Sequence, residues 1–205
     1  MFLKKIPLFL IIFLGVVFSI LPACKAVQTT TTSKNVEATV PNNPQNDVIY
    51  SLILAKWQRD VHLYENFMLL FSASVTLMSP EMQQAYKTRF EQIQGVGEPD
   101  SKLIPSEGKN ILSLVVNMYT SNHKFDDLND NKIWNCTLVS QQKTLSPISI
   151  LYYNNKDIFA PYFTLGSLWS REYVIQFELP DGNFDRNSLV FSMHSAIADA
   201  HYFWR

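Results

Sequence analysis

Two histidines and a carboxylate lie close together near the C-terminus, at His194, Asp199 and His201. Two imidazoles with a carboxylate are the groups that a metal site or a general base uses. The spacing matches no HExxH motif and brings no further metal ligand nearby. Two predictions stay open: a metal-dependent or hydrolytic enzyme that uses these three residues, or histidines that face solvent or pair across a β-hairpin.

One short acidic segment is rich in oxygen ligands. Asp127, Asn129 and Asn131 are spaced two apart, like the first three ligands of a calcium-binding loop. Lys132 stands where that loop needs glycine, and Leu138 stands where it needs a bidentate glutamate, so an EF-hand is excluded. An Asx-rich turn between strands and an irregular calcium site remain as alternatives. The candidate binding residues of this segment are Asp126, Asp127, Asn129 and Asp130.

Aromatic side chains crowd the segment 152–169, where Pro161 and the polar residues from Asn154 to Asp157 indicate loops. Exposed aromatic rings flanked by amides could bind a glycan or a partner protein. Packing in the core and cover for an edge strand are the alternative, because large aromatics dominate the interiors of β-sandwiches. The candidate binding residues of this segment are Tyr152, Tyr153, Tyr162 and Trp169.

The other reactive groups predict little chemistry. Cys136 lies within an alternating strand pattern, which favours buried packing over a role as nucleophile. A GxSxG nucleophile elbow is missing, because Gly166-Ser167 is followed by Leu168 and Trp169. Glycine motifs that bind phosphate are also missing from the sequence, so nucleotide chemistry is excluded.

Composition bounds the protein further. The chain has 205 residues, of which 47% are hydrophobic and 17% charged, enough apolar material for one packed domain with a tail. The 17 basic and 18 acidic residues give a formal net charge of -1, without the basic footprint of a nucleic-acid binder. We expect no nucleic-acid partner and no cofactor.

The N-terminus, residues 1–23, has the form of a signal peptide. Lys4 and Lys5 precede an uncharged apolar run from Ile6 to Ala23. The run is slightly short for a membrane span, contains two prolines and ends in small residues, so cleavage is favoured over spanning. An uncleaved anchor helix and simple secretion are the alternatives.

The end of this run, Leu21-Pro22-Ala23-Cys24, resembles the lipobox of bacterial lipoproteins, with Pro22 where the family usually has Ala, Ser or Thr. The resemblance implies that Cys24 becomes an acylated N-terminus that holds the protein to membrane lipid. It places the protein in the bacterial cell envelope, facing the periplasm or the exterior. Lys25 follows where an Asp is associated with inner-membrane retention, which favours the outer membrane in a Gram-negative cell.

Residues 24–46 are predicted to be a lipidated N-terminus and a flexible tether without secondary structure. From Ala26 to Asn46 the segment carries a threonine run, asparagines and prolines, and no aromatic residue. Without Lys4 and Lys5 the chain keeps 15 basic and 18 acidic residues, a net charge of -3, so the acyl chains and not a basic patch would hold the membrane.

Residues 47–205 are predicted to form an immunoglobulin-like β-sandwich carrying one or two helices. Cap-type residues precede a helical pattern that ends near Trp57, and Ser79-Pro80-Glu81 predicts a helical insertion near 80–93. Strands are predicted at 61–78, 111–119 (central, apolar on both faces), 133–139, 172–179 (one face wet), 189–193 and 200–204.

The folded part also resembles a group of uncharacterised bacterial envelope lipoproteins. The resemblance is carried by Trp57, Arg59, Tyr64, Ser79-Pro80-Glu81, Ala85-Tyr86, Phe90, Tyr119-Thr120, Asp127-Leu128, Trp134, Pro147, Ile150, Phe163, Tyr173, Phe177 and Trp204. It implies an exported, lipid-anchored β-rich domain and names no activity. We therefore predict a non-enzymatic binding or envelope-assembly module whose partner is another envelope protein or a glycan. The alternatives are an envelope enzyme that uses the three C-terminal residues or the loop Asp126–Asp130, and a spacer.

Overall fold

The computed structural model describes residues 35–37, 48–95, 97–105, 110–154, 159–164, 169–180 and 185–205. The signal peptide, Cys24 and most of the predicted tether lie outside the described residues. Within the described residues, no helix is long and apolar enough to cross a membrane.

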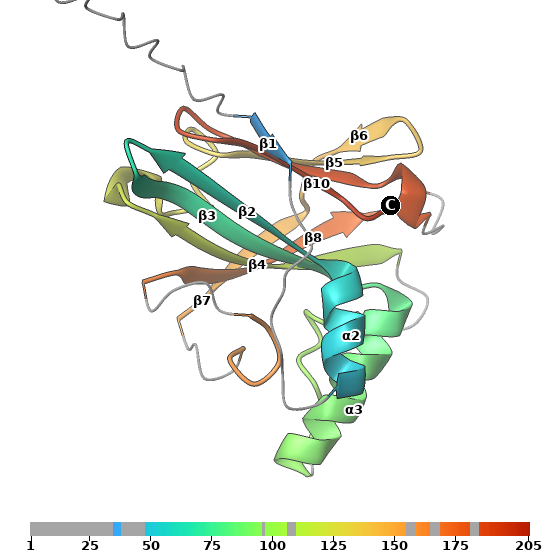
Figure 1. Cartoon of the computed structure of the whole chain (residues 1–205). Coiled ribbons are helices and arrows are strands. Elements are labelled where there is room, and N and C mark those ends of the chain that lie inside the picture. The colour runs from blue at the N-terminus through green and yellow to red at the C-terminus, as the bar shows by residue number, and fades with distance from the viewer. Residues whose placement is uncertain are drawn as a thin grey trace, which may run out of the picture. The chain divides into compact units, whose positions relative to one another are not determined.

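Two five-stranded sheets lie face to face, with two helices at one end (Figure 1). Sheet A has the order β1 (Asn35–Glu37), β10 (Asp199–Phe203), β9 (Val190–His194), β5 (Asn135–Ser140) and β6 (Lys143–Leu145). Sheet B has the order β2 (Gln58–Glu65), β3 (Met68–Leu77), β4 (Ile111–Thr120), β8 (Arg171–Glu178) and β7 (Ser149–Tyr153). Among the described strands, every pair is antiparallel except β1 and β10. The prediction of a β-sandwich that carries helices is confirmed.

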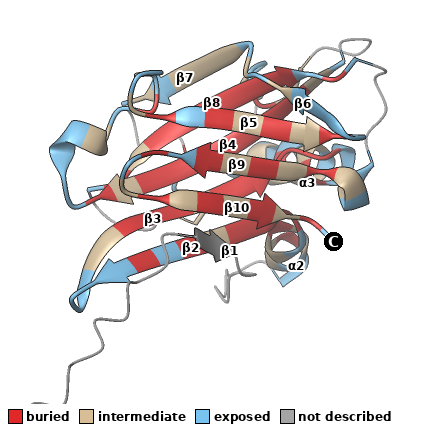
Figure 2. Ribbon diagram, turned by 90° about the horizontal axis from the view of Figure 1, so that it is seen from above, coloured by how far each residue is buried: buried red, intermediate tan, exposed pale blue. Residues whose placement is uncertain are grey.

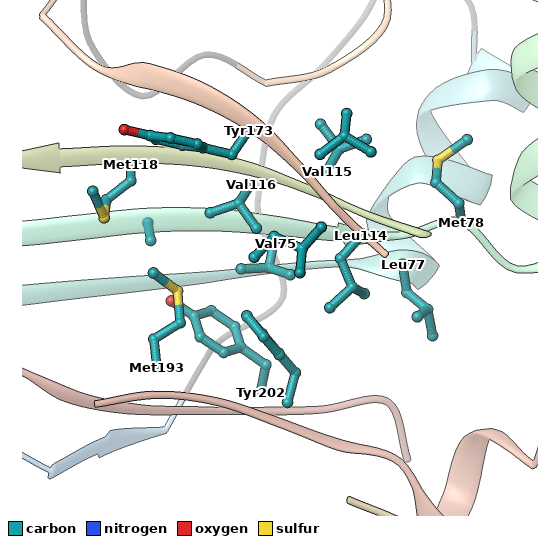
Figure 3. Packing of buried hydrophobic residues seen from close by; sticks show 14 of the residues in the cluster. Val75, Leu77, Met78, Leu114, Val115, Val116, Met118, Tyr173, Met193 and Tyr202 are labelled. Carbon is teal, nitrogen blue, oxygen red and sulfur yellow. The ribbon is translucent and has the colours of Figure 1, made fainter. Parts of the chain in front are cut away.

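The core lies between the sheets and extends to the far side of sheet B, because consecutive residues of β4 and β8 are buried. Figure 2 shows the buried stretches along the strands. Val75 and Leu114 lie on the side of sheet B that faces Met193 and Tyr202 of sheet A (Figure 3). Across the same interface, the rings of Phe177 and Phe191 meet edge to face with their centroids 6.0 Å apart.

Both helices follow from local signals. α2 (Val48–Trp57) ends at the predicted residue. α3 (Pro80–Gln94) begins after Ser79, whose side chain accepts a hydrogen bond from the backbone N–H of Met82 at 3.1 Å. It ends at Gly95, which has a φ of 74° and donates its N–H to Glu91 at 2.9 Å. The predicted helix 80–93 is confirmed.

The prediction of one strand over 61–78 is wrong in its connectivity, because the segment is a hairpin of β2 and β3. Asn66 and Phe67 form a two-residue turn, with φ values of 49° and 65°, between the paired residues Glu65 and Met68. Such turns usually carry Asn-Gly. Phenylalanine at the second position gives no turn signal, so the sequence pattern continues through the turn.

The wet face predicted for strand 172–179 is also wrong. In β8, Glu172 and Gln176 are buried together with the apolar residues between them. Glu172 accepts a hydrogen bond from Asn117 Nδ2 at 2.9 Å, and Gln176 Nε2 donates to the carbonyl of Lys102 at 3.1 Å. Polar partners from other elements therefore allow a polar alternation to be buried.

The other strand predictions differ in detail. β4 lies between β3 and β8, which confirms the prediction of a central strand. β6 and β7 were not predicted. The tether prediction is wrong at Asn35–Glu37, because β1 pairs in parallel with β10. The physical reason is that the edge of β10 presents unpaired backbone groups, which a passing segment satisfies.

Candidate functional site

The predicted His–Asp cluster forms on the β9–β10 hairpin. The register places Asp199 opposite His194, and His201 opposite Ser192. Asp199 Oδ1 lies 3.5 Å from His194 Nδ1 and 3.3 Å from His201 Nε2, and Ser192 Oγ lies 2.9 Å from His201 Nδ1. The structure therefore brings the three predicted residues together and adds a serine that the sequence analysis did not select.

This cluster is a surface arrangement. Its residues alternate with the buried Met193 and Ala200, so they lie on the outer side of sheet A. The side chains of His194 and His201 are 63% and 35% exposed, so water reaches both imidazoles. Among the described residues, no group of three or more His, Cys, Asp or Glu side chains could hold a metal ion. The two histidines lie on the two strands of one hairpin and each contacts Asp199, but the register does not place them opposite each other.

The acidic segment forms Asx turns. Asp127 Oδ1 accepts the N–H of Asn129 at 2.9 Å, and Asp130 Oδ1 accepts the N–H of Lys132 at 2.9 Å. Asp126 is instead held by Arg171 Nη2 at 2.8 Å. The carboxylates therefore organise the connection between β4 and β5 through Asx turns, one of the two alternatives left open by the sequence.

The aromatic candidates separate into packed and exposed rings. Tyr162 is buried, and its ring meets that of Tyr86 edge to face, with centroids 4.9 Å apart. Tyr153 donates its hydroxyl to Asp100 Oδ2 at 2.6 Å, and burial raises its pKa. Tyr152 and Trp169 are exposed. For Tyr153 and Tyr162 the packing alternative holds, and they offer no free surface for a ligand.

Cys136 is buried in β5, as predicted. Burial raises the pKa of its thiol to about 12, so the thiolate that a nucleophile needs is disfavoured. This residue packs in the core of the sandwich.

A groove between α2 and α3 is the site that the sequence analysis missed. It encloses a hollow of about 380 Å³. It is lined by Ile49, Tyr50, Ile53, Glu81, Gln84, Ala85, Thr88, Arg89 and Gln92. The walls combine apolar side chains of α2 with the polar and charged face of α3.

The sequence of α2 contains the signal for this groove. Tyr50, Leu54 and Trp57 are buried against the rest of the fold. Val48, Ile49 and Leu52 remain exposed beside the groove, at 67–74% of their full accessible area. α2 therefore carries apolar residues both on the face that packs against the fold and on its exposed faces. The exposed apolar residues would be buried only by a second surface, such as that of a binding partner.

Charges of both signs fix the rim of the groove. Glu81 accepts hydrogen bonds from Lys56 Nζ at 2.5 Å and Trp57 Nε1 at 2.9 Å, and these bonds lower the pKa of its carboxyl group. The guanidinium of Arg89 lies 5.3 Å from the ring centroid of Tyr50, whose hydroxyl donates to the carbonyl of Tyr162. The rim is thus ordered before any ligand binds.

The sequence matches no protein-family model, and it shows no detectable similarity to a curated protein or to a solved structure. The resemblance to bacterial lipoproteins therefore stays a prediction.

Proposed function

We propose that this protein is an exported, lipid-anchored binding module of the bacterial cell envelope, and that it is not an enzyme. Acylated Cys24 would hold it on a membrane, with the outer membrane favoured in a Gram-negative cell. The apolar leader and the sequence Leu21-Pro22-Ala23-Cys24 support the anchor. The β-sandwich would then lie outside the cytoplasmic membrane.

The groove between α2 and α3 is the single observation that carries the binding role. A binding module is expected to carry an apolar patch rimmed by polar groups, and Ile49 and Ile53 with Glu81 and Arg89 supply both parts. An enzyme is expected to hold its imidazole and carboxylate in a hollow that excludes water. His194 lies instead on the open face of sheet A.

We assign the groove to an apolar segment of another envelope protein. The exposed Val48, Ile49 and Leu52 extend the apolar wall of the groove across α2, which suits a chain more than a compact ligand. A glycan would need an open aromatic face to stack on, and Arg89 lies over the ring of Tyr50. The partner would bury an apolar surface that the fold leaves exposed.

The anchor is tested on the residue that would carry it. Cys24→Ala should abolish acyl labelling and leave the protein either precursor-like or released from the membrane. Mass spectrometry of the wild-type protein should show an N-terminus that begins at an acylated Cys24. A retained Met1, or an unmodified sulfur on Cys24, would reject the anchor.

The groove is tested by crosslinking in the intact envelope. A photoreactive amino acid at position 52 replaces the exposed Leu52, and the crosslinked product is compared in two further variants. Thr88→Trp places an indole in the groove and should abolish the crosslink. Lys87→Trp adds the same indole to the preceding residue of α3, which does not line the groove, and should leave the crosslink intact. A crosslink that survives Thr88→Trp would show that the groove does not hold the partner.

A hydrolase is the second candidate, because Ser192, His201 and Asp199 form a continuous line of contacts. The order of nucleophile, base and orienting carboxylate is that of a serine hydrolase. Turnover of an ester substrate that is lost in Ser192→Ala but kept in Ser188→Ala would favour this candidate over the binding module.

A further inference from the structure

The turn between β2 and β3 displays an aromatic side chain that the fold does not use. Phe67 has a φ of 65°, and its relative exposure is 104%, so the side chain packs against no other residue that the structure describes. A bulky residue in this left-handed conformation is strained, and glycine would adopt it freely. Folding therefore gives no reason for phenylalanine at this position.

Further apolar side chains lie at the same end of the sandwich. Tyr64 and Met68 flank the turn and are exposed. Trp169 is 80% exposed and precedes β8, whose first residue, Arg171, pairs with Met118 of β4 near the end of that strand. Because β3 starts at the end where β8 starts and β4 finishes, these residues belong to one end of sheet B. Figure 1 shows the β2–β3 turn at the end of the sandwich away from the helices.

The N-terminal chain joins the domain at this end as well. β1 starts at Asn35, which pairs with Asp199 at the start of β10. β1 and β2 are edge strands of the two sheets, and they contact each other. Eleven residue steps separate Cys24 from Asn35, a span of at most about 40 Å.

We propose that the tip of the β2–β3 hairpin, with Phe67 at its apex, inserts into the lipid bilayer that holds acylated Cys24. The inference rests on the lipid anchor of the proposed function. A short connection that enters beside the hairpin keeps this end of the domain at the membrane surface. Tyr and Trp side chains are enriched at the boundary between lipid and water, and Phe buries its ring in the same boundary region.

Insertion at this end is driven by apolar contact and not by charge. Asp126, Asp127 and Asp130 share the end of the sandwich with Lys124 and Arg171, because the connection from β4 to β5 lies there. These charges give no basic patch that would favour anionic lipid. We therefore expect the tip to insert into neutral phosphatidylcholine as well as into anionic membranes.

Insertion of the tip orients the groove. β2 runs from the end of α2 to the hairpin turn, and its eight residues span about 26 Å. The α2–α3 groove therefore lies at the opposite end of the sandwich from the tip (Figure 1). A membrane-bound hairpin would present the groove away from the lipid, where a partner can reach it.

The test places a fluorescent probe at the tip of the full-length acylated protein. Phe67→Cys is labelled with an environment-sensitive dye, and the protein is reconstituted in phosphatidylcholine vesicles with or without brominated acyl chains. Buried Cys136 and acylated Cys24 leave position 67 as the reactive thiol. Gln142→Cys is the matched control: Gln142 is exposed in a turn of the same geometry, with a φ of 66°, at the other end of the sandwich.

The expected result is a blue-shifted emission that brominated lipid quenches at position 67, with neither effect at position 142. An acylated protein whose probe at position 67 emits as in water, or is quenched no more than the probe at position 142, overturns the insertion. Mass spectrometry of the same sample measures the acylation of Cys24 independently of the fluorescence. A protein without acyl chains that still shows quenching at position 67 overturns the anchor and supports insertion by the tip alone.

Discussion

Phe67→Gly should stabilise the fold, although it removes a large apolar side chain. The replacement turns the β2–β3 turn into Asn-Gly, the preferred pair for a two-residue turn in which both φ angles are positive. Because Phe67 is fully exposed, no buried contact is lost. The effect on stability therefore comes from the backbone.

The size of the effect follows from two opposing terms. A non-glycine residue in the left-handed region destabilises the folded state by about 1–2 kcal/mol, and Phe67→Gly removes this strain. The greater freedom of glycine in the unfolded chain offsets about 0.5–1 kcal/mol of this stabilisation. The net gain in the free energy of unfolding is about 0.5–1 kcal/mol. For a domain of this size that corresponds to a rise in Tm of roughly 1–4 °C.

Urea and thermal unfolding of the full-length protein, followed by circular dichroism, measure this gain. Gln142→Gly is the control, because Gln142 is exposed and has nearly the same φ as Phe67, 66° against 65°. Both variants should gain similar stability, and the double variant should gain the sum, since the turns are at opposite ends of the sandwich. A destabilised Phe67→Gly beside a stabilised Gln142→Gly would refute the reasoning, because the phenylalanine side chain would then support the fold.

Two further predictions concern the end of the sandwich that carries the helices. Trp204→Ala should lower the free energy of unfolding by about 3–5 kcal/mol in urea titrations. The reason is that Trp204 is fully buried and its Nε1 donates to the carbonyl of Trp57 at 2.6 Å. Trp204→Phe should lower the free energy of unfolding by less. Lys56 lowers the pKa of Glu81, so that pair should stabilise the fold above about pH 4.5 and lose its effect as pH falls through the lowered pKa. Glu81→Gln should therefore flatten the acid limb of a plot of Tm against pH, and an unchanged limb would contradict the ion pair.

Local signals made the helices predictable from the sequence. Ser79 and Pro80 start α3, and the side chain of Ser79 accepts a hydrogen bond from a backbone N–H of the first turn. Gly95 ends the helix and donates its own N–H to a carbonyl of the last turn. The hairpin of β2 and β3 was not predictable by the same means. Its turn carries Phe67 where the usual signal is glycine, so the strand pattern hides the reversal.

Contacts between distant residues explain the error in β8. The alternation of Glu172 and Gln176 with apolar residues is what a half-exposed strand shows. Asn117, which pairs with Glu172, is 55 residues away in the sequence and becomes a neighbour only when β4 and β8 pair. Periodicity reports the polarity of a face but not whether another element supplies its hydrogen bonds.

The candidate sites differ for the same reason. His194, Asp199 and His201 lie within eight residues, so a single hairpin accounts for their meeting. The groove needs α2 and α3, whose lining residues Ile53 and Glu81 are 28 positions apart, with a hairpin between them. The excess of apolar residues around α2 indicated an unpaired surface, but the second wall came only from the fold.

β1 decides which end of the sandwich the membrane would meet. If Asn35–Glu37 did not pair with β10, the chain would leave the fold at Val48, beside the groove. The 24 residue steps between Cys24 and Val48 would then allow a span of up to about 86 Å. The hairpin tip would then be at the far end from the anchor. Replacing residues 35–37 with Gly-Ser-Gly should therefore reduce the quenching of a probe at position 67 by brominated lipid, while acylation of Cys24 and the melting of the sandwich core change little. Undiminished quenching would mean that the tip inserts without help from the position of the tether.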